Sequence, residues 1–195
     1  MNANAIARVT QAMGARLQQA IDASGYPQGS LFIGPLDDPG AAGATLILFL
    51  YRIAPNASLR NGEHRVPSAN PPPSVIVHDN ALPLDLYYLL TVGNHPSGNE
   101  DPLLGVLGFA LQALQAAPEL TGPPVGQEVV RLTLEPLSTE ETSRIWALFP
   151  TANYRTSVAY LASPVWIDPA QPPIPARVVL EDNLDVGMRA TVPVD

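Results

Sequence analysis

The first part of the chain has the spacing of an amphipathic helix. Apolar residues recur at intervals of three and four positions from Ile6 to Ile21, which places them on one stripe of a helix, with arginine and glutamine largely on the other side. A Ser-Gly pair at 24–25 predicts the end of this helix. The breaker-rich segment 25–43 predicts a loop that contains one short strand at 30–33.

Three segments have the apolar patterns of longer strands. Segment 45–53 is almost continuously apolar, so we expect a strand that is buried on both faces at the centre of a sheet. Segment 82–92 has an ambiguous period; we favour a strand in which Pro83 occupies the first position or lies on an edge. Segment 128–137 alternates between apolar and polar residues and predicts a half-exposed strand. Shorter strands are predicted at 74–77, at 156–167 with an interruption at Pro164, and at 177–180.

Two further helices are indicated by their first residues. Asp101 is the expected N-cap of a helix over 102–117, with proline at the first helical position. Ser138 and Glu141 form a capping-box motif, which predicts a helix that ends near Phe149. The expected apolar face of the first of these helices consists of Leu103, Leu104, Leu107, Leu111 and Leu114.

The order of these elements mixes helices and strands without strict alternation. This pattern predicts one α+β domain with a mixed or mainly antiparallel sheet and about three helices packed on one face. The domain is expected to span residues 1–180, followed by an acidic tail or arm at 181–195. Proline and glycine are frequent, with 22 and 14 residues, but 46% of the chain is hydrophobic, which is enough to form a core.

The charge balance argues against several classes of partner. All 10 basic residues are arginine, and they stand against 18 acidic residues, for a formal charge of −8. Such a chain lacks the phosphate neutralisation on which nucleic-acid binding depends, and anionic membranes repel it. Cysteine and lysine are absent from the sequence, which excludes thiol chemistry, P-loop lysines and Schiff bases. No apolar run approaches the ~20 residues of a membrane helix, and the start does not resemble a signal peptide, so we expect a soluble protein made in the cytosol.

The residues that could carry out chemistry are scattered along the sequence. His64, His78 and His95 form no short metal-binding pair, and we expect them in surface loops without a metal. Adjacent acids, as at 37–38 and 100–101, are expected to be solvated, and the sequence has no nucleophile-elbow motif. This pattern favours a structural protein that is not an enzyme and has no cofactor. The alternative is a small-molecule-binding or hydrolytic α+β domain that uses loop carboxylates.

Three stretches taken together resemble one family. They are LPLDLYYLLT at 82–91, LLGVLGFALQALQAAPEL at 103–120, and the run over 131–167 that begins with RLTLEPLSTEETSRIWALF. In combination they are similar to the N-terminal domain of the tail-terminator, or cap, proteins of phage-tail-like contractile injection systems of the antifeeding-prophage and virulence-cassette type. The resemblance extends from the first helix to about Leu180, which is nearly the whole chain.

The resemblance implies a structural role. Such proteins assemble as a ring, expected to be a hexamer, on the baseplate-distal end of the inner tube, where they end tube growth and anchor the last layer of sheath. The implied partners are copies of the same chain and the tube and sheath proteins, with no nucleic acid, no membrane, no cofactor and no reaction. Assembly is expected in the cytoplasm, on an intracellular or released particle.

The C-terminal segment is the candidate for contacts with the sheath or with a neighbouring subunit. An extended arm from residue 177 onward could add a strand to a partner sheet, with alternate apolar side chains as anchors and acids that select the partner. The candidate interface residues are Val178, Val179, Leu180, Glu181, Asp182, Leu184 and Asp185.

Overall fold

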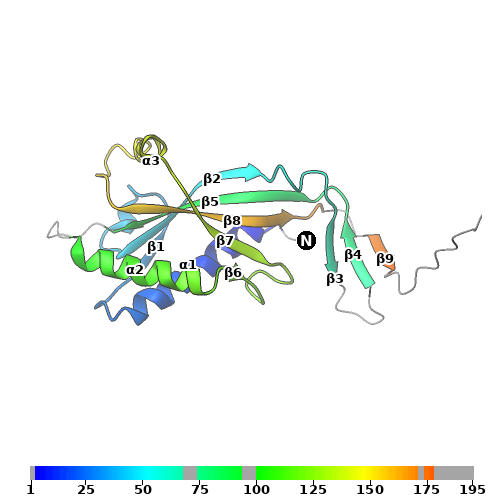
Figure 1. Ribbon diagram of the computed structural model, residues 1–195, viewed down its shortest axis with the longest axis horizontal. Coiled ribbons are helices and arrows are strands. Elements are labelled where there is room, and N and C mark those ends of the chain that lie inside the picture. Colours follow the sequence, from blue (N-terminus) through cyan, green and yellow to red (C-terminus); the bar gives the residue numbers. More distant parts are fainter. Residues whose placement is uncertain (1–2, 68–73, 94–99, 171–173, 178–195) are drawn as a thin grey trace, which may run out of the picture.

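The computed structural model describes residues 3–67, 74–93, 100–170 and 174–177. Within these residues the chain forms three α-helices, a curved six-stranded sheet and a separate three-stranded sheet (Figure 1). The helices are α1 (Ala5–Ala23), α2 (Asp101–Ala116) and α3 (Thr139–Trp146), with a short 3-10 helix at Pro39–Ala41. The large sheet consists of β1 (Leu31–Ile33), β2 (Leu46–Pro55), β5 (Leu82–Val92), β6 (Glu119–Leu120), β7 (Val130–Glu135) and β8 (Ser157–Ile167), and the small sheet of β3 (His64–Pro67), β4 (Ser74–His78) and β9 (Ile174–Arg177).

The large sheet is mixed, as the sequence predicted. Its strand order is β1-β2-β5-β8-β7-β6; β1 runs parallel to β2, and all other pairs are antiparallel. This arrangement confirms the α+β class. The central strand is β5, however, and not the apolar segment around β2, which is buried on both faces only over Leu46–Leu48 and becomes exposed towards Pro55. Pro83 is the second residue of β5 and lies on a strand that is paired on both sides.

Helices cover both faces of the large sheet. On one face, α1 and α2 bury residues such as Met13 and Leu107 against the β5 side chains that include Tyr88. On the opposite face, Ile145 and Trp146 of α3 pack in a second cluster together with Ile47 and Leu89. The prediction that the helices share one face therefore holds for α1 and α2, whereas α3 lies on the other face.

The starts of the later helices match the sequence only in part. The capping box of α3 is present, because the Glu141 N–H donates to Ser138 Oγ at 3.2 Å and the Ser138 N–H donates to Glu141 Oε2 at 2.9 Å. Helix α2 begins at Asp101, one residue earlier than expected, so Glu100 occupies the N-cap position without a side-chain cap hydrogen bond. The prediction that Asp101 is the N-cap is wrong. The outer face of α2 also differs, since Leu104 is 40% exposed and Val106 takes its place in the core.

Strand β8 continues through Pro164 and is not interrupted there. The pairing with β5 shifts between Leu84 and Leu86, so Ser163 and Pro164 together lie opposite Asp85. Two residues opposite one is the pattern of a β-bulge, which accommodates a residue without an N–H donor inside the ladder. Asp85 Oδ1 accepts hydrogen bonds from Ser163 Oγ at 2.6 Å and from Asn56 Nδ2 at 2.9 Å.

The small sheet was only partly predicted. Strand β4 occurs where expected, β3 has no counterpart in the prediction, and β9 lies at 174–177 in place of 177–180. The order is β3-β4-β9, with both pairs antiparallel. Figure 1 places this sheet at one end of the molecule, beyond the ends of β5 and β8 and away from α2 and α3. The chain thus has a packed body and a small sheet that extends from it.

Candidate functional site

Three polar side chains meet where the small sheet joins the large one. His64 is the first residue of β3, His78 is the last residue of β4, and Asp168 directly follows β8. His64 and His78 are directly opposite each other in the β3–β4 register, so their side chains lie on the same face of the sheet. Their ring centroids are 5.6 Å apart, and the His64 ring also stacks on Trp166 of β8, with a centroid distance of 4.7 Å and an interplanar angle of 9°.

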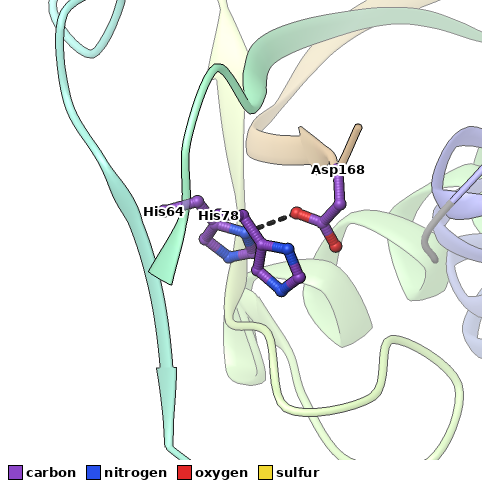
Figure 2. A group of neighbouring side chains, drawn as sticks. All are labelled: His64, His78 and Asp168. Atoms are coloured by element: carbon purple, nitrogen blue, oxygen red, sulfur yellow. Dashed lines mark hydrogen bonds and ion pairs between the residues drawn. The ribbon is translucent and has the colours of Figure 1, made fainter. Parts of the chain in front are cut away.

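His64 is held by two carboxylates. Its Nδ1 atom lies 2.7 Å from Asp168 Oδ1 (Figure 2), and its Nε2 atom lies 2.8 Å from Glu128 Oε1. The His64 side chain is 4% exposed. Burial alone lowers the pKa of His64, but the hydrogen bonds to Glu128 and Asp168 outweigh it and raise this pKa above its ordinary value of 6.5. The cluster therefore favours positive charge at His64.

The expectation of histidines in surface loops is wrong for this cluster. His64 is buried and His78 is half-buried, and both lie in strands. The two histidines lie side by side because β3 pairs with β4. The proline-rich sequence between these strands gives no sign of this pairing. Sequence reasoning also missed Glu128 and Asp168, for which the chain carries no local signal. His95 lies outside the described residues.

A second feature is a charged pocket of about 360 Å³ at the other end of the molecule. Its lining includes Asp37, Asp38 and Glu100, which were expected to be solvated separately, together with Arg155. Arg155 is 9% exposed, its guanidinium lies 5.6 Å from the centroid of the Trp146 ring, and its Nη1 atom has no hydrogen-bond partner within the described part of the chain. Burial lowers the pKa of Arg155, and the charge of Glu100 opposes this effect. Small-molecule sites are mostly lined by apolar side chains, whereas the lining of this pocket is rich in charged residues.

The surface also carries exposed apolar side chains. Among large hydrophobic residues, those at least 40% exposed include Ile53 on β2, Phe109 on α2 and Leu134 on β7. Single exposed apolar residues are normal, but residues on strand edges are suited to contacts between subunits. The candidate interface predicted from the sequence, Val178, Val179, Leu180, Glu181, Asp182, Leu184 and Asp185, lies outside the described residues. None of the helices within the described ranges is long and apolar enough to cross a membrane.

The fold is that of terminator proteins from contractile injection systems. One solved structure with this fold is the PVC sheath/tube terminator of an extracellular contractile injection system in its extended state; the TM-score is 0.59 at 20% identity, over 96% of this chain and 65% of that one. A second is the tube-terminating cap of the anti-feeding prophage, with a TM-score of 0.60 at 20% identity, over 91% of this chain and 60% of that one. This chain thus spans less than two thirds of the length of either protein.

The family follows from the sequence itself. A family model, the Pvc16 N-terminal domain, matches residues 8–181, and the chain belongs to this family. A comparison with curated proteins gives no significant match. The family resemblance inferred from three stretches of sequence is confirmed, and the match covers nearly the whole chain.

Proposed function

We propose that this protein caps the inner tube of a contractile injection particle, where it ends tube growth and holds the last layer of sheath. The observation that carries the proposal is the family match over residues 8–181. The shared fold with a sheath/tube terminator and with a tube-terminating cap supports it. In this role the protein works through its surface and performs no reaction.

The edges of the large sheet support assembly into a ring. Among the residues that the structure describes, β1 pairs with Leu46–Leu48 alone, so the rest of the long strand β2 extends beyond it. At the other side of the sheet, the pairing of β6 within the described ranges is limited to Val130 and Arg131, and β7 extends beyond it to Glu135. A closed ring needs two different surfaces that contact each other head to tail. The two partly covered edges, with Ile53 on one and Leu134 on the other, provide such a pair, and six copies are the number that the family resemblance favours.

The segment after β9 is proposed as the contact with the sheath or with a neighbouring subunit. Strand β9 is an edge strand of the small sheet, paired with β4 alone in the described part of the chain. The residues that follow it, from Val178 to Asp185, combine apolar and acidic side chains. An extended segment of this kind can add a strand to a partner sheet, with the acids selecting a basic partner.

The tube length distribution tests the proposal. The gene is deleted in a strain that produces the particles, and tube lengths are measured by electron microscopy. We expect irregular or excessive lengths, and restored lengths after complementation with the wild-type gene. An unchanged length distribution after deletion contradicts a terminator role.

A truncated version of the complementing gene tests the segment after β9 separately. A protein that ends at Leu180 lacks residues 181–195 but keeps all except the last residue of the matched domain. We expect it to restore tube length while particles lose their distal sheath layer. Light scattering after size-exclusion chromatography establishes that the truncated protein has the same assembly state as the full chain, and a normal sheath on these particles contradicts the assigned contact.

A further inference from the structure

The histidine cluster has the composition and spacing of a metal site. His64, His78 and Asp168 each offer one ligand atom, and these three atoms all lie within 4.8 Å of one another (Figure 2). Two imidazoles and one carboxylate form a ligand set that holds zinc and related first-row ions in proteins. We propose that these three residues bind one divalent transition-metal ion of the zinc type, with water completing its coordination. This inference does not depend on the proposed cap function.

The hydrogen bonds of His64 assign its ligand atom. Glu128 accepts from Nε2–H at 2.8 Å, which is the usual position of a carboxylate that orients a metal-binding histidine. This bond requires a proton on Nε2, so in the neutral imidazole it is Nδ1 that has a free electron pair. Nδ1 lies 2.7 Å from Asp168 Oδ1, and both atoms are then acceptors. Their contact requires a positive charge between them, which is either a proton or a metal ion.

The surroundings of His78 favour a metal ion over a proton between His64 and Asp168. Its Nδ1 atom is buried and has no hydrogen-bond partner within the described ranges. A buried polar nitrogen without a partner is costly. Figure 2 shows the His78 ring beside that of His64, with one ring nitrogen on the side of Asp168. A proton between His64 and Asp168 satisfies two of the three residues, whereas a metal ion also gives His78 a partner.

The local charge is consistent with a divalent ion. Asp168 and Glu128 are 8% and 19% exposed, so two carboxylates are largely withdrawn from water. Arg8 lines the small cavity beside Glu128, but its guanidinium donates to the Pro123 carbonyl oxygen at 3.5 Å. With two neutral imidazoles, a divalent cation balances the two carboxylates, whereas a single proton leaves one negative charge uncompensated.

The ligand atoms need only small movements to close on an ion. With bonds of about 2.0–2.2 Å, the ligand atoms of a tetrahedral zinc ion lie about 3.4 Å apart. The nitrogen of His64 and the oxygen of Asp168 must separate slightly, and the widest pair of ligand atoms, which are no more than 4.8 Å apart, must come closer together. Side-chain rotation of His78 and Asp168 supplies shifts of about 1 Å without a change in the strands.

Zinc binding to the full chain tests the proposal. The purified protein is stripped with a chelator, and Zn²⁺ is titrated at about pH 7.5 by calorimetry. The variants are His78→Phe, which keeps a flat ring against His64, and Asp168→Asn, which keeps the side-chain shape. His95→Gln is the matched control because it removes the one histidine outside the cluster. Circular dichroism establishes that each variant is folded, and the absorption spectrum of Co²⁺ bound to the wild type provides a measurement that needs no variant.

We expect one Zn²⁺ per chain and a loss of at least about 100-fold in affinity for His78→Phe, since even the loss of an outer-shell partner costs 10- to 100-fold. His95→Gln should bind as the wild type does. Zn²⁺ in excess should raise the melting temperature of the wild type by roughly 5–10 °C and leave that of His78→Phe unchanged. The absence of saturable binding, or equal binding by wild type and both cluster variants, overturns the proposal and leaves a proton as the only charge between His64 and Asp168. An absorption spectrum of Co²⁺ with the protein that is identical to that of the hydrated ion also overturns the proposal.

Discussion

A chain of two hydrogen bonds joins the central strand to the first helix. Tyr88 is fully buried in the middle of β5. Its hydroxyl oxygen lies 2.8 Å from Thr10 Oγ1, and Thr10 Oγ1 lies 2.8 Å from the carbonyl oxygen of Ile6. Since a carbonyl oxygen only accepts, Thr10 donates to Ile6, and Tyr88 donates to Thr10. Each hydroxyl proton therefore has a fixed direction.

Removing either of the two hydroxyl groups of these hydrogen bonds should have a different cost. Tyr88→Phe removes the first donor and leaves Thr10 bonded to Ile6, so we expect a loss of about 1 kcal/mol, the net value of an ordinary hydrogen bond. Thr10→Val leaves the Tyr88 hydroxyl buried without its acceptor, which should cost about 2 kcal/mol, within the range for an orphaned buried polar group. The double variant orphans no hydroxyl, so its loss should stay close to about 1 kcal/mol.

Chemical denaturation of the wild type and the three variants measures this coupling. The free energy of unfolding is obtained by circular dichroism at about pH 7, with denaturant slopes compared so that a change in stability is separated from a change in the unfolded state. Thr142→Val in α3 is a matched control, because its hydroxyl also bonds to the carbonyl oxygen four residues earlier, at 3.0 Å. A coupling energy of about 2 kcal/mol is expected; losses that add to within about 0.5 kcal/mol would refute the reasoning.

Two further predictions concern backbone packing and alkaline stability. A Cβ atom at Gly93 would lie 1.6 Å from the Ala44 carbonyl oxygen, so Gly93→Ala should lower the free energy of unfolding by about 3 kcal/mol or more. Gly105 lies in α2 with open space around it, so Gly105→Ala should raise the free energy of unfolding by up to about 1 kcal/mol. Equal melting temperatures of the two variants contradict this prediction. Burial raises the pKa of Tyr88 from 10.0 to about 12, with the Thr10 hydrogen bond acting against it. The unfolded chain therefore loses this proton first, and stability should fall by about 1.4 kcal/mol per pH unit between about pH 10 and 12. The urea midpoint of the wild type should therefore fall to that of Tyr88→Phe within about one pH unit above pH 10 and lie below it at about pH 12; a constant difference contradicts the assignment.

The sequence was most informative for long helices and strands that bury one side, because that burial determines the spacing of their apolar residues. The three- and four-residue spacing from Ile6 to Ile21 predicted α1, because that spacing reflects burial against a single sheet face. The capping box at Ser138 and Glu141 was confirmed because both of its bonds are local. The alternation in β7 held for Val130 and Leu132, which are buried, and failed at Leu134, which is 49% exposed near the end of the strand.

The sequence was least informative where contacts join distant segments. Strand β3 has four residues, and its pairing with β4 leaves no periodic pattern to detect. Neither Glu128 nor Asp168 differs in sequence from an ordinary loop acid, and only the approach of three segments makes them partners of His64. Helical spacing also cannot decide between Leu104 and Val106 in α2, since the packing angle against α1 determines which side is buried.

Side-chain contacts connect the small sheet to the large one. In the described part of the chain, β3, β4 and β9 hydrogen-bond as strands only to one another. Contacts with the large sheet include those of His64, which stacks on Trp166 and bonds to Asp168 at the end of β8. The segment proposed to bind sheath begins directly after β9, which belongs to the same small sheet. We therefore expect a change in the charge of the cluster, or in the metal ion proposed there, to affect the strand from which this segment starts, even though His64 and Val178 are far apart in the sequence.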